Sequence, residues 1–171
     1  SGSPASHIAG LEYADGDWSP SHWSKFESDM YDANVTGDGT YTVWMETTSM
    51  AEGASVFCVD INKLSNDIID ISKVKVEVES VKLDVNPNFN MDYSHTVFVN
   101  KDGKGVDGRI EIYNEYGTTK TAGVNASALS FVGNMIVNFT ISGIDGNLVA
   151  NASKSYSTEL SYAAASWSPS Y

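Results

Sequence analysis

The sequence contains few of the residues on which most enzyme sites depend. It has one cysteine, Cys58, and three histidines, His7, His22 and His95, in 171 residues. A single cysteine excludes an intrachain disulfide, and the apolar run around Cys58 predicts a buried thiol. The histidines stand in polar stretches typical of exposed loops. The catalytic motifs Gly-X-Ser-X-Gly and His-Glu-X-X-His are absent, and no glycine-rich phosphate loop precedes a helix.

Positive charge is also scarce. Ten Lys and Arg residues against 22 Asp and Glu residues give a formal net charge of −12. Nucleic acids and anionic membrane surfaces are bound by clustered basic side chains, so both are excluded as expected partners. No apolar run approaches the roughly 20 residues that cross a bilayer. A neutral ligand or a cation fits this charge better.

The many carboxylates leave two chemical alternatives open. A glycosidase uses a pair of them, but Glu46 and Glu111 lack the apolar surroundings that raise the pKa of a catalytic acid, so we expect a protein that is not an enzyme. Asp15 and Asp17, in an Asp-Gly-Asp turn, are the candidate metal ligands for a structural calcium ion. No stretch has the full calcium-loop pattern, and solvated turn carboxylates are the favoured interpretation.

Residues 40–48 have the clearest strand pattern in the chain. Apolar side chains alternate there with polar ones at period 2, which predicts a strand with one face on a core. Tyr41, Val43 and Met45 form the apolar face, whereas Trp44 and Glu46 fall on the opposite, polar face. A large aromatic ring on a polar face indicates either a covering loop or a binding surface.

The rest of the chain alternates short strands with turns. Residues 55–62 are apolar almost throughout and predict a central strand buried on both faces. In residues 74–85 the apolar positions change parity, which predicts a bulge or a tight turn near Ser80. Further strands are expected at residues 11–14, 96–99, 109–113, 129–132, 135–142 and 157–165, with one helical turn within residues 66–73.

This pattern predicts an all-β fold, an antiparallel β-sandwich of jelly-roll type with roughly eight to ten strands. We expect residues 1–10 to be a linker or an expression scar. Residues 11–165 are expected to form the single domain, and residues 166–171 a C-terminal linker.

Four tryptophans, Trp18, Trp23, Trp44 and Trp167, lie in polar stretches, outside the apolar runs that build the core. Sugars present flat C–H faces that stack on aromatic rings and hydroxyl edges that form hydrogen bonds. We expect Trp167 to cover one end of the sandwich and the other three to bind sugar. Polar partners, provided that they share one sheet with the rings, would be Thr42, Glu46, Arg109, Glu111, Tyr113, Asn114 and Asn138.

Residues 17–23, 35–43, 56–61 and 109–117 resemble the non-catalytic carbohydrate-binding modules of bacterial plant-cell-wall hydrolases. The most similar kind is the β-sandwich module of cellulases from anaerobic gut bacteria that binds β-glucans and xyloglucan. The resemblance implies a secreted, extracellular module, including one attached to a cell surface. It would act as a monomeric part of a larger chain.

By this resemblance, the module would target a parent hydrolase or cellulosomal protein to β-1,4-glucans such as cellulose, xyloglucan and mixed-linkage glucan. Trp18, Trp23 and Trp44 would line the sugar site. The alternative is a structural or adhesion module of a cell-surface or scaffold protein, whose aromatic patch binds another protein.

Overall fold

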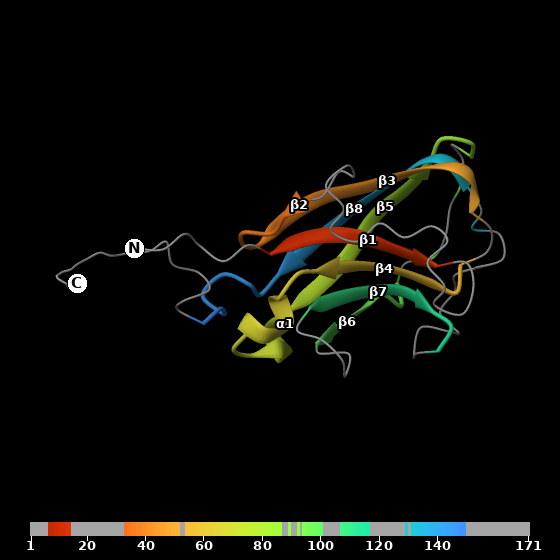
Figure 1. Ribbon diagram of the computed structural model, residues 1–171. Coiled ribbons are helices and arrows are strands. Elements are labelled where there is room, and N and C mark those ends of the chain that lie inside the picture. Colours follow the sequence, from red (N-terminus) through yellow and green to blue (C-terminus); the bar gives the residue numbers. More distant parts are fainter. Residues whose placement is uncertain are drawn as a thin grey trace.

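Strands in two layers make up the computed structural model of this chain (Figure 1). Both sheets are antiparallel and helix is almost absent, so the prediction of an all-β fold is confirmed. The strand expected at residues 157–165 lies outside the described part of the chain. That part comprises residues 7–14, 33–51, 54–86, 89, 92, 94–100, 107–116, 129 and 131–149.

One sheet has five strands in the order β2-β1-β4-β7-β6. Its central strand β4 is buried at every residue, which confirms the prediction for residues 55–62. The N-terminal boundary was predicted wrongly: Ile8 pairs with Asn34 and Ala9 is fully buried, so residues 8–10 belong to the sheet rather than to a linker. The strands are β1 (Ile8–Ala14), β2 (Ala33–Asn34), β4 (Val56–Ile61), β6 (Val97–Asn100) and β7 (Gly108–Asn114).

The other sheet has three strands, in the order β3 (Gly39–Ala51), β8 (Phe131–Ser142) and β5 (Lys75–Leu83). The two strands expected at residues 129–132 and 135–142 are one strand, β8. Gly133 and Asn134 interrupt the apolar alternation there. Both residues nevertheless stay paired with β3, because cross-strand pairing continues through positions where the side-chain pattern breaks.

The predicted irregularity near Ser80 is a β-bulge in β5. Val78 pairs with Phe139 and Ser80 pairs with Asn138, which leaves Glu79 as the additional residue. A bulge adds one residue to one strand and shifts the side-chain parity. Val78 and Val81 can therefore both face the core, where their exposed fractions are 6% and 3%.

Two short helical turns follow β4. One helical turn was predicted within residues 66–73, but the structure has two: α1 (Leu64–Asp67), which begins before that range, and the 3-10 turn η1 (Ile71–Lys73). Asn147, which follows β8, fastens this region to the three-stranded sheet. Its side-chain amide donates to the carbonyl oxygens of Asp70 and Gly143, each at 2.8 Å, and its Oδ1 accepts from the Asp70 backbone at 2.9 Å.

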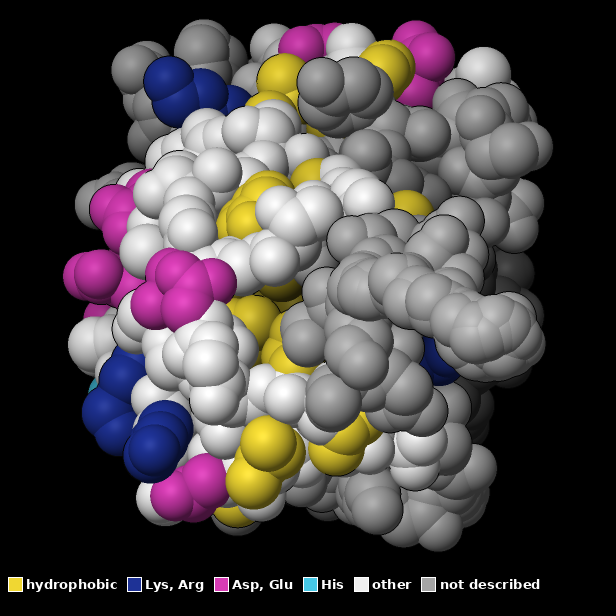
Figure 2. Space-filling model, turned by 90° about the vertical axis from the view of Figure 1, so that its left-hand side faces the viewer, with side chains coloured by type: hydrophobic (Ala, Val, Ile, Leu, Met, Phe, Trp, Pro, Cys, Tyr) yellow, Lys and Arg dark blue, Asp and Glu magenta, His cyan; other side chains and the backbone are white. Residues whose placement is uncertain are grey.

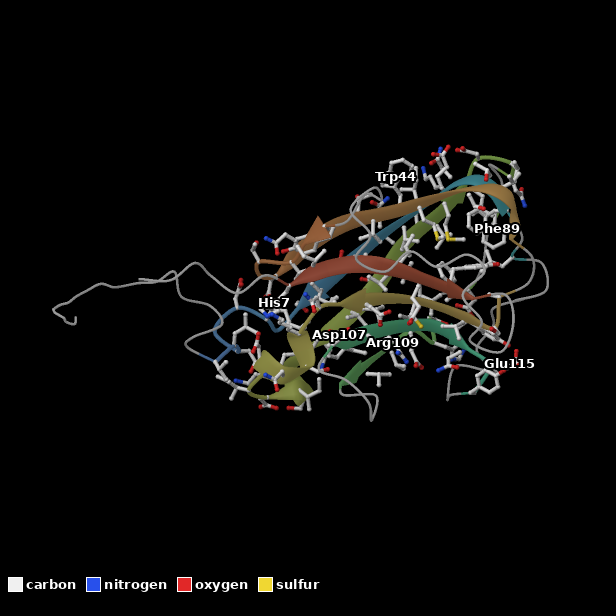
Figure 3. The ribbon with its side chains drawn as sticks, viewed as in Figure 1. His7, Trp44, Phe89, Asp107, Arg109 and Glu115 are labelled. Atoms are coloured by element: carbon white, nitrogen blue, oxygen red, sulfur yellow. The ribbon has the colours of Figure 1, made fainter. Side chains whose placement is uncertain are left out.

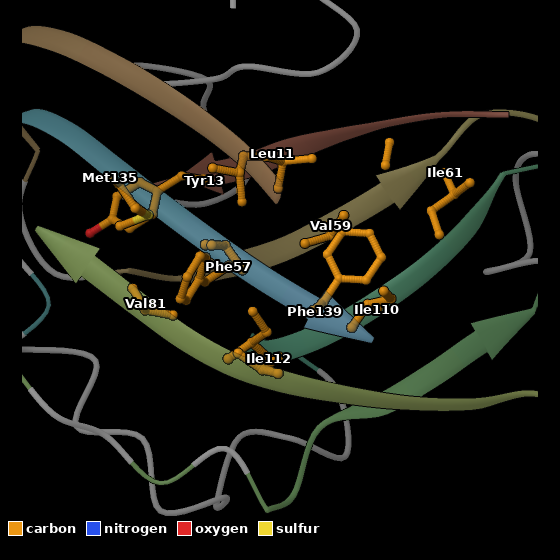
Figure 4. Packing of buried hydrophobic residues seen from close by; sticks show 14 of the residues in the cluster. Leu11, Tyr13, Phe57, Val59, Ile61, Val81, Ile110, Ile112, Met135 and Phe139 are labelled. Atoms are coloured by element: carbon orange, nitrogen blue, oxygen red, sulfur yellow. The ribbon is translucent and has the colours of Figure 1, made fainter. Parts of the chain in front are cut away.

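One hydrophobic core lies between the sheets (Figure 4). Val43 and Met45 are buried in it and Tyr41 packs against it, as the alternation of residues 40–48 predicted. The Tyr13 ring meets Phe57 and Phe131 edge to face, with centroid distances of 6.0 and 5.3 Å. Its hydroxyl donates to the backbone carbonyl oxygen of Leu129 at 2.5 Å, so this buried polar group is satisfied.

The predictions for the burial of Cys58 and the exposure of His7 had different outcomes. Cys58 is a buried free thiol, as expected. His7 is not exposed, since only 2% of its surface is accessible and its Nε2 lies 2.7 Å from Asp67 Oδ2. The polar sequence around His7 concealed this contact, because its partner comes from α1, sixty positions away. None of the helices in the described residues is long and apolar enough to cross a membrane.

Candidate functional site

The described residues of the predicted binding site fall into two groups on different sheets. Trp44 and Glu46 belong to β3 and Asn138 to the adjacent β8, but Arg109, Glu111 and Tyr113 belong to β7. Figure 3 shows Trp44 and Arg109 on opposite sides of the two layers. The condition that the polar partners share one sheet with Trp44 is therefore not met by Arg109, Glu111 and Tyr113. Trp18, Trp23, Trp167 and the candidate metal ligands Asp15 and Asp17 lie outside the described residues.

Arg109 is the centre of a buried ionic cluster on the outer face of the five-stranded sheet. Its Nε donates to Asp60 Oδ1 at 3.2 Å and lies 3.5 Å from Glu12 Oε1, while its Nη1 lies 3.5 Å from Glu111 Oε2. Asn114 donates from its amide to the same Glu111 oxygen at 2.9 Å. All five residues are less than 9% exposed, so this face is closed at its centre.

The charges in this cluster shift the pKa values of its members. Burial acts to lower the pKa of Arg109, but the nearby carboxylates of Asp60 and Glu12 outweigh burial and raise it. Burial, followed by the same two carboxylates, raises the pKa of the Cys58 thiol. Arg109 therefore keeps its positive charge, and Cys58 remains a neutral thiol. A neutral thiol reacts poorly as a nucleophile.

The candidate site residues on β7 therefore make contacts within the protein that stabilise its fold. Arg109 and Glu111 bond each other and their neighbours within the buried cluster of the outer face, whereas Tyr113 is part of the hydrophobic core with 9% of its surface exposed. Burial and the charge of Glu115 raise the pKa of the Tyr113 hydroxyl. Within the described residues, no group of three or more His, Cys, Asp or Glu side chains is placed to hold a metal ion.

The outer face of the three-stranded sheet has a different character, and we call it the open face. Its side chains are half-buried along the central strand β8 and exposed at many positions of the two edge strands. They lie in rows across the strands, because paired residues of neighbouring strands point to the same side. The open face comprises Thr40, Thr42, Trp44 and Glu46 of β3, Asn134, Ile136, Asn138 and Thr140 of β8, and Glu77, Ser80 and Lys82 of β5.

Hydrogen bonds join the polar rows of the open face. In one row Thr42 Oγ1 donates to Asn138 Oδ1, and Asn138 Nδ2 donates to Ser80 Oγ at 3.0 Å. In the next polar row the Thr140 hydroxyl bonds Thr40 Oγ1 at 2.8 Å and Glu79 Oε2 at 2.9 Å. These bonds fix the side chains before any ligand arrives, which lowers the entropy that binding costs.

Trp44 lies in an apolar row between polar ones. It pairs with Ile136 of β8, which pairs in turn with Lys82 of β5. Figure 3 shows the Trp44 side chain on the outer side of β3, away from the core. On the other side of this row, Asn134 Nδ2 donates to Asp84 Oδ2 at 2.8 Å, and Glu46 is exposed opposite Asn134.

The open face therefore combines the apolar side chains of Trp44 and Ile136 with polar groups on both sides. Successive rows are two residues apart along a strand, or about 6.6 Å. A ring stacked over Trp44 and Ile136 would place its edges toward Asn138 in one direction and Asn134 in the other. Such an arrangement suits a ligand with apolar faces and hydroxylated edges.

No protein-family model, curated protein or solved structure matches this chain.

Several residues of the open face were not singled out by sequence reasoning, notably Ile136, Lys82, Ser80 and Thr140. The alternation of residues 135–142 already placed Ile136 and Thr140 on one side of a strand. Their association with Trp44 depends on the pairing of β3 with β8, about ninety positions along the chain. Local alternation does not specify which strands become neighbours.

Proposed function

We propose that this protein is a non-catalytic carbohydrate-binding module for neutral β-1,4-linked glucans. The ligand lies on the open face, where Trp44 and Ile136 provide the stacking surface. Asn138, Glu46 and Asn134 provide the hydrogen-bonding groups beside it. The module is a secreted, monomeric part of a larger chain and brings a parent hydrolase or cellulosomal protein to the plant cell wall.

The observation that carries this proposal is the position of Trp44. It stands half-buried on the outer side of a sheet, in a row flanked on both sides by hydrogen-bonded polar side chains. In the part of the chain that the structure describes, the outer face of the five-stranded sheet offers no comparable surface, since its central charged residues are buried and bonded to one another. Among the described residues, the open face is therefore the better candidate for binding a polysaccharide.

The jelly-roll form of the sandwich is part of the same proposal. The chain crosses from one sheet to the other in the connections from β3 to β4, β4 to β5, β5 to β6 and β7 to β8. Repeated crossing between two facing antiparallel sheets is typical of Greek-key and jelly-roll sandwiches.

Replacing Trp44 tests both the proposed function and the location of the binding site on the open face. We expect Trp44→Ala to weaken binding of mixed-linkage glucan and xyloglucan at least 30-fold, since truncation of a central aromatic anchor costs about 2 kcal/mol or more. The measurement is native affinity electrophoresis against soluble polysaccharides, followed by calorimetric titration of those that retard the wild type.

Tyr116→Ala is the matched control. Tyr116 is 53% exposed but follows β7, on the other sheet, so its loss should leave the affinity unchanged. Equal affinity of wild type and Trp44→Ala for every glucan would refute the open face as the site. Absence of binding by the wild type to all soluble glucans and to insoluble cellulose would refute the proposed function.

A structural or adhesion module that binds another protein remains the second proposal. It is favoured by exposed apolar side chains near η1, where Ile69 is 65% and Ile71 is 39% exposed. Figure 2 views the end of the molecule where α1 lies and shows apolar side chains in separate groups among polar and charged ones. A stable complex with another domain of the parent chain, together with no glucan binding, would support this alternative.

A further inference from the structure

Four Asn-X-Ser/Thr sequences occur in the chain, at Asn34, Asn125, Asn138 and Asn151. This tripeptide is the acceptor sequence for N-glycosylation, and the attached glycan needs a surface position because it is bulky and hydrated. Asn125 and Asn151 lie outside the described residues. Asn34 and Asn138 have different surroundings, so the structure distinguishes between them as acceptors.

Asn34 has an accessible side chain at the edge of the five-stranded sheet. It is the last residue of β2, the outermost of the described strands on one side of that sheet (Figure 1). Asn34 and Thr36 are exposed, whereas Val35 between them is 1% exposed. The Val35 nitrogen donates to the carbonyl oxygen of His7 at 2.9 Å, which continues the extended backbone past the end of β2. Asn34 and Thr36 therefore project from the same side of an extended segment.

This geometry suits the transfer of a glycan. The transferase has to contact the hydroxyl group of the third residue and the side-chain amide of the asparagine at the same time. Within the described residues, neither the Asn34 amide nor the Thr36 hydroxyl has a hydrogen-bond partner. An amide nitrogen is a weak nucleophile, because its lone pair is delocalised into the carbonyl group. Hydrogen bonds that held the amide in place would add to the barrier, and Asn34 has none to break.

Asn138 provides the opposite case. It lies on β8, between β3 and β5, and its side chain is half-buried. Its Nδ2 donates to Ser80 Oγ at 3.0 Å, and its Oδ1 accepts from Thr42 Oγ1. The hydroxyl of Thr140, which completes this tripeptide, donates to Glu79 Oε2 at 2.9 Å. These bonds would have to break before Asn138 reacted, which disfavours it as an acceptor in the folded protein.

The sequence before Asn34 adds a second distinction. Bacterial oligosaccharyltransferases that modify folded proteins also require an acidic residue two positions before the asparagine, and Asp32 stands at that position. None of the other three asparagines has an acidic residue there, since the corresponding residues are Gly123, Ile136 and Val149. Asn34 therefore has both the complete acceptor sequence and an accessible side chain.

We infer that Asn34 is an N-glycosylation site, modified after folding by an oligosaccharyltransferase of this kind. The co-substrate is an oligosaccharide linked to a polyprenyl diphosphate. Nδ2 of Asn34 forms a bond to the anomeric carbon of the first sugar, while the bond from that carbon to the diphosphate oxygen breaks. The diphosphate leaves with the bonding electrons, and one amide proton passes to a base of the transferase.

The glycan is attached away from the proposed binding surface. Asn34 belongs to the five-stranded sheet, whereas the open face belongs to the three-stranded sheet. This modification site is therefore independent of the proposed function, and either one can fail in experiment without the other.

Modification of the purified full chain in vitro tests the site. The folded protein is incubated with a purified bacterial oligosaccharyltransferase and its polyprenyl-diphosphate-linked oligosaccharide, and the products are analysed by intact mass and by glycopeptide sequencing. We expect a single glycan per chain, at Asn34. Asn34→Gln and Asp32→Ala should each abolish the modification. Asn125→Gln, which removes a tripeptide without the acidic residue, is the matched control and should leave it unchanged.

A further variant separates the effect of structure from that of sequence. Ile136→Asp places an acidic residue two positions before Asn138, so that this asparagine also has the complete acceptor sequence. In the folded variant, Asn138 should stay unmodified because its amide is held by hydrogen bonds. A synthetic peptide of residues 134–142 with the same substitution should be modified.

Two results would overturn the assignment. One is an unmodified Asn34 in the folded wild type, under conditions in which the transferase modifies a synthetic peptide of residues 30–38. The other is modification of Asn138 in folded Ile136→Asp at the same rate as Asn34, which would show that accessibility does not select the acceptor. The first result needs no variant, so the assignment stays falsifiable if Ile136→Asp does not fold.

Discussion

Arg109 and Trp44 are both unusual side chains for the outer face of a sheet, yet their surroundings assign them opposite roles. Arg109 is buried among the carboxylates of Asp60, Glu12 and Glu111. Trp44 is half-buried in an open row beside Ile136. The burial of each side chain, rather than its chemical type, determines whether it can meet a ligand.

Removal of the Arg109 charge should destabilise the fold. Arg109→Met leaves several buried carboxylates without their cation, and breaking a buried ion pair from one side costs about 3 to 5 kcal/mol. The free energy of unfolding, measured by urea denaturation at pH 7, should fall by that amount. A free energy of unfolding close to that of the wild type would contradict the structural role of the cluster.

Lys73→Met provides the comparison for this experiment. Lys73 is exposed in η1, so its loss should change the free energy of unfolding by no more than about 0.5 kcal/mol. Glucan affinity should be unchanged in the folded fraction of both variants, because neither residue lies on the open face.

At the scale of elements, two turns bond each other at one end of the three-stranded sheet. Asp38, before β3, accepts from the backbone nitrogens of Ile144 at 2.7 Å and Asp145 at 3.1 Å. In return, the Asp145 carboxylate accepts from the Asp38 nitrogen at 3.2 Å. A Cβ at Gly37 would collide with Oδ1 of Asp145, so a larger residue there would displace the carboxylate that accepts from the Asp38 nitrogen.

These contacts make the turns sensitive to acid. The hydrogen bonds from the backbone of Asp145 and then Ile144 lower the pKa of Asp38. A carboxylate whose folded pKa is below its unfolded value of about 3.9 stabilises the fold above that value, and its contribution is lost as the pH falls through the folded pKa.

Stability should therefore fall between about pH 5 and pH 2 more steeply in the wild type than in Asp38→Asn, which keeps an acceptor oxygen but does not titrate. Urea denaturation at several pH values in this range measures the difference. Parallel pH profiles for the two proteins would show that Asp38 makes no such contribution.

At the scale of the whole molecule, the net charge of −12 restricts the class of ligand. The open face adds to this restriction, since Glu46 and Glu77 outnumber Lys82 there. The carboxylate of Glu79, which is bonded to Thr140 of this face, adds a further negative charge. Negative charge on both the face and the molecule repels acidic polysaccharides over about a Debye length. Neutral glucans experience no such repulsion.

Salt should therefore distinguish a neutral from a charged ligand. The dissociation constant for mixed-linkage glucan should change less than twofold between low salt and about 0.5 M sodium chloride, because no ion pair forms with the sugar. Pectate, as the acidic comparison, should not bind at low salt. A marked loss of glucan affinity in salt, or binding of pectate, would contradict a neutral-sugar site.

Local sequence patterns predicted most of the described strands and the direction of many side chains. The period-2 pattern of residues 40–48 placed Val43 inward and Trp44 outward, and the parity change near Ser80 corresponds to the bulge in β5. Such features follow from backbone geometry within a few residues, where adjacent side chains of a strand alternate between faces.

The choice of neighbouring strands and the closure of one outer face depend instead on contacts between distant segments. β3 and β7 belong to different sheets, so Arg109 and Glu111 are separated from Trp44, while Ile136 and Lys82 join it. His7 is buried because Asp67 reaches it from α1. These contacts join distant segments, and the free energy that selects them comes from burial and pairing across the whole domain rather than from local pattern.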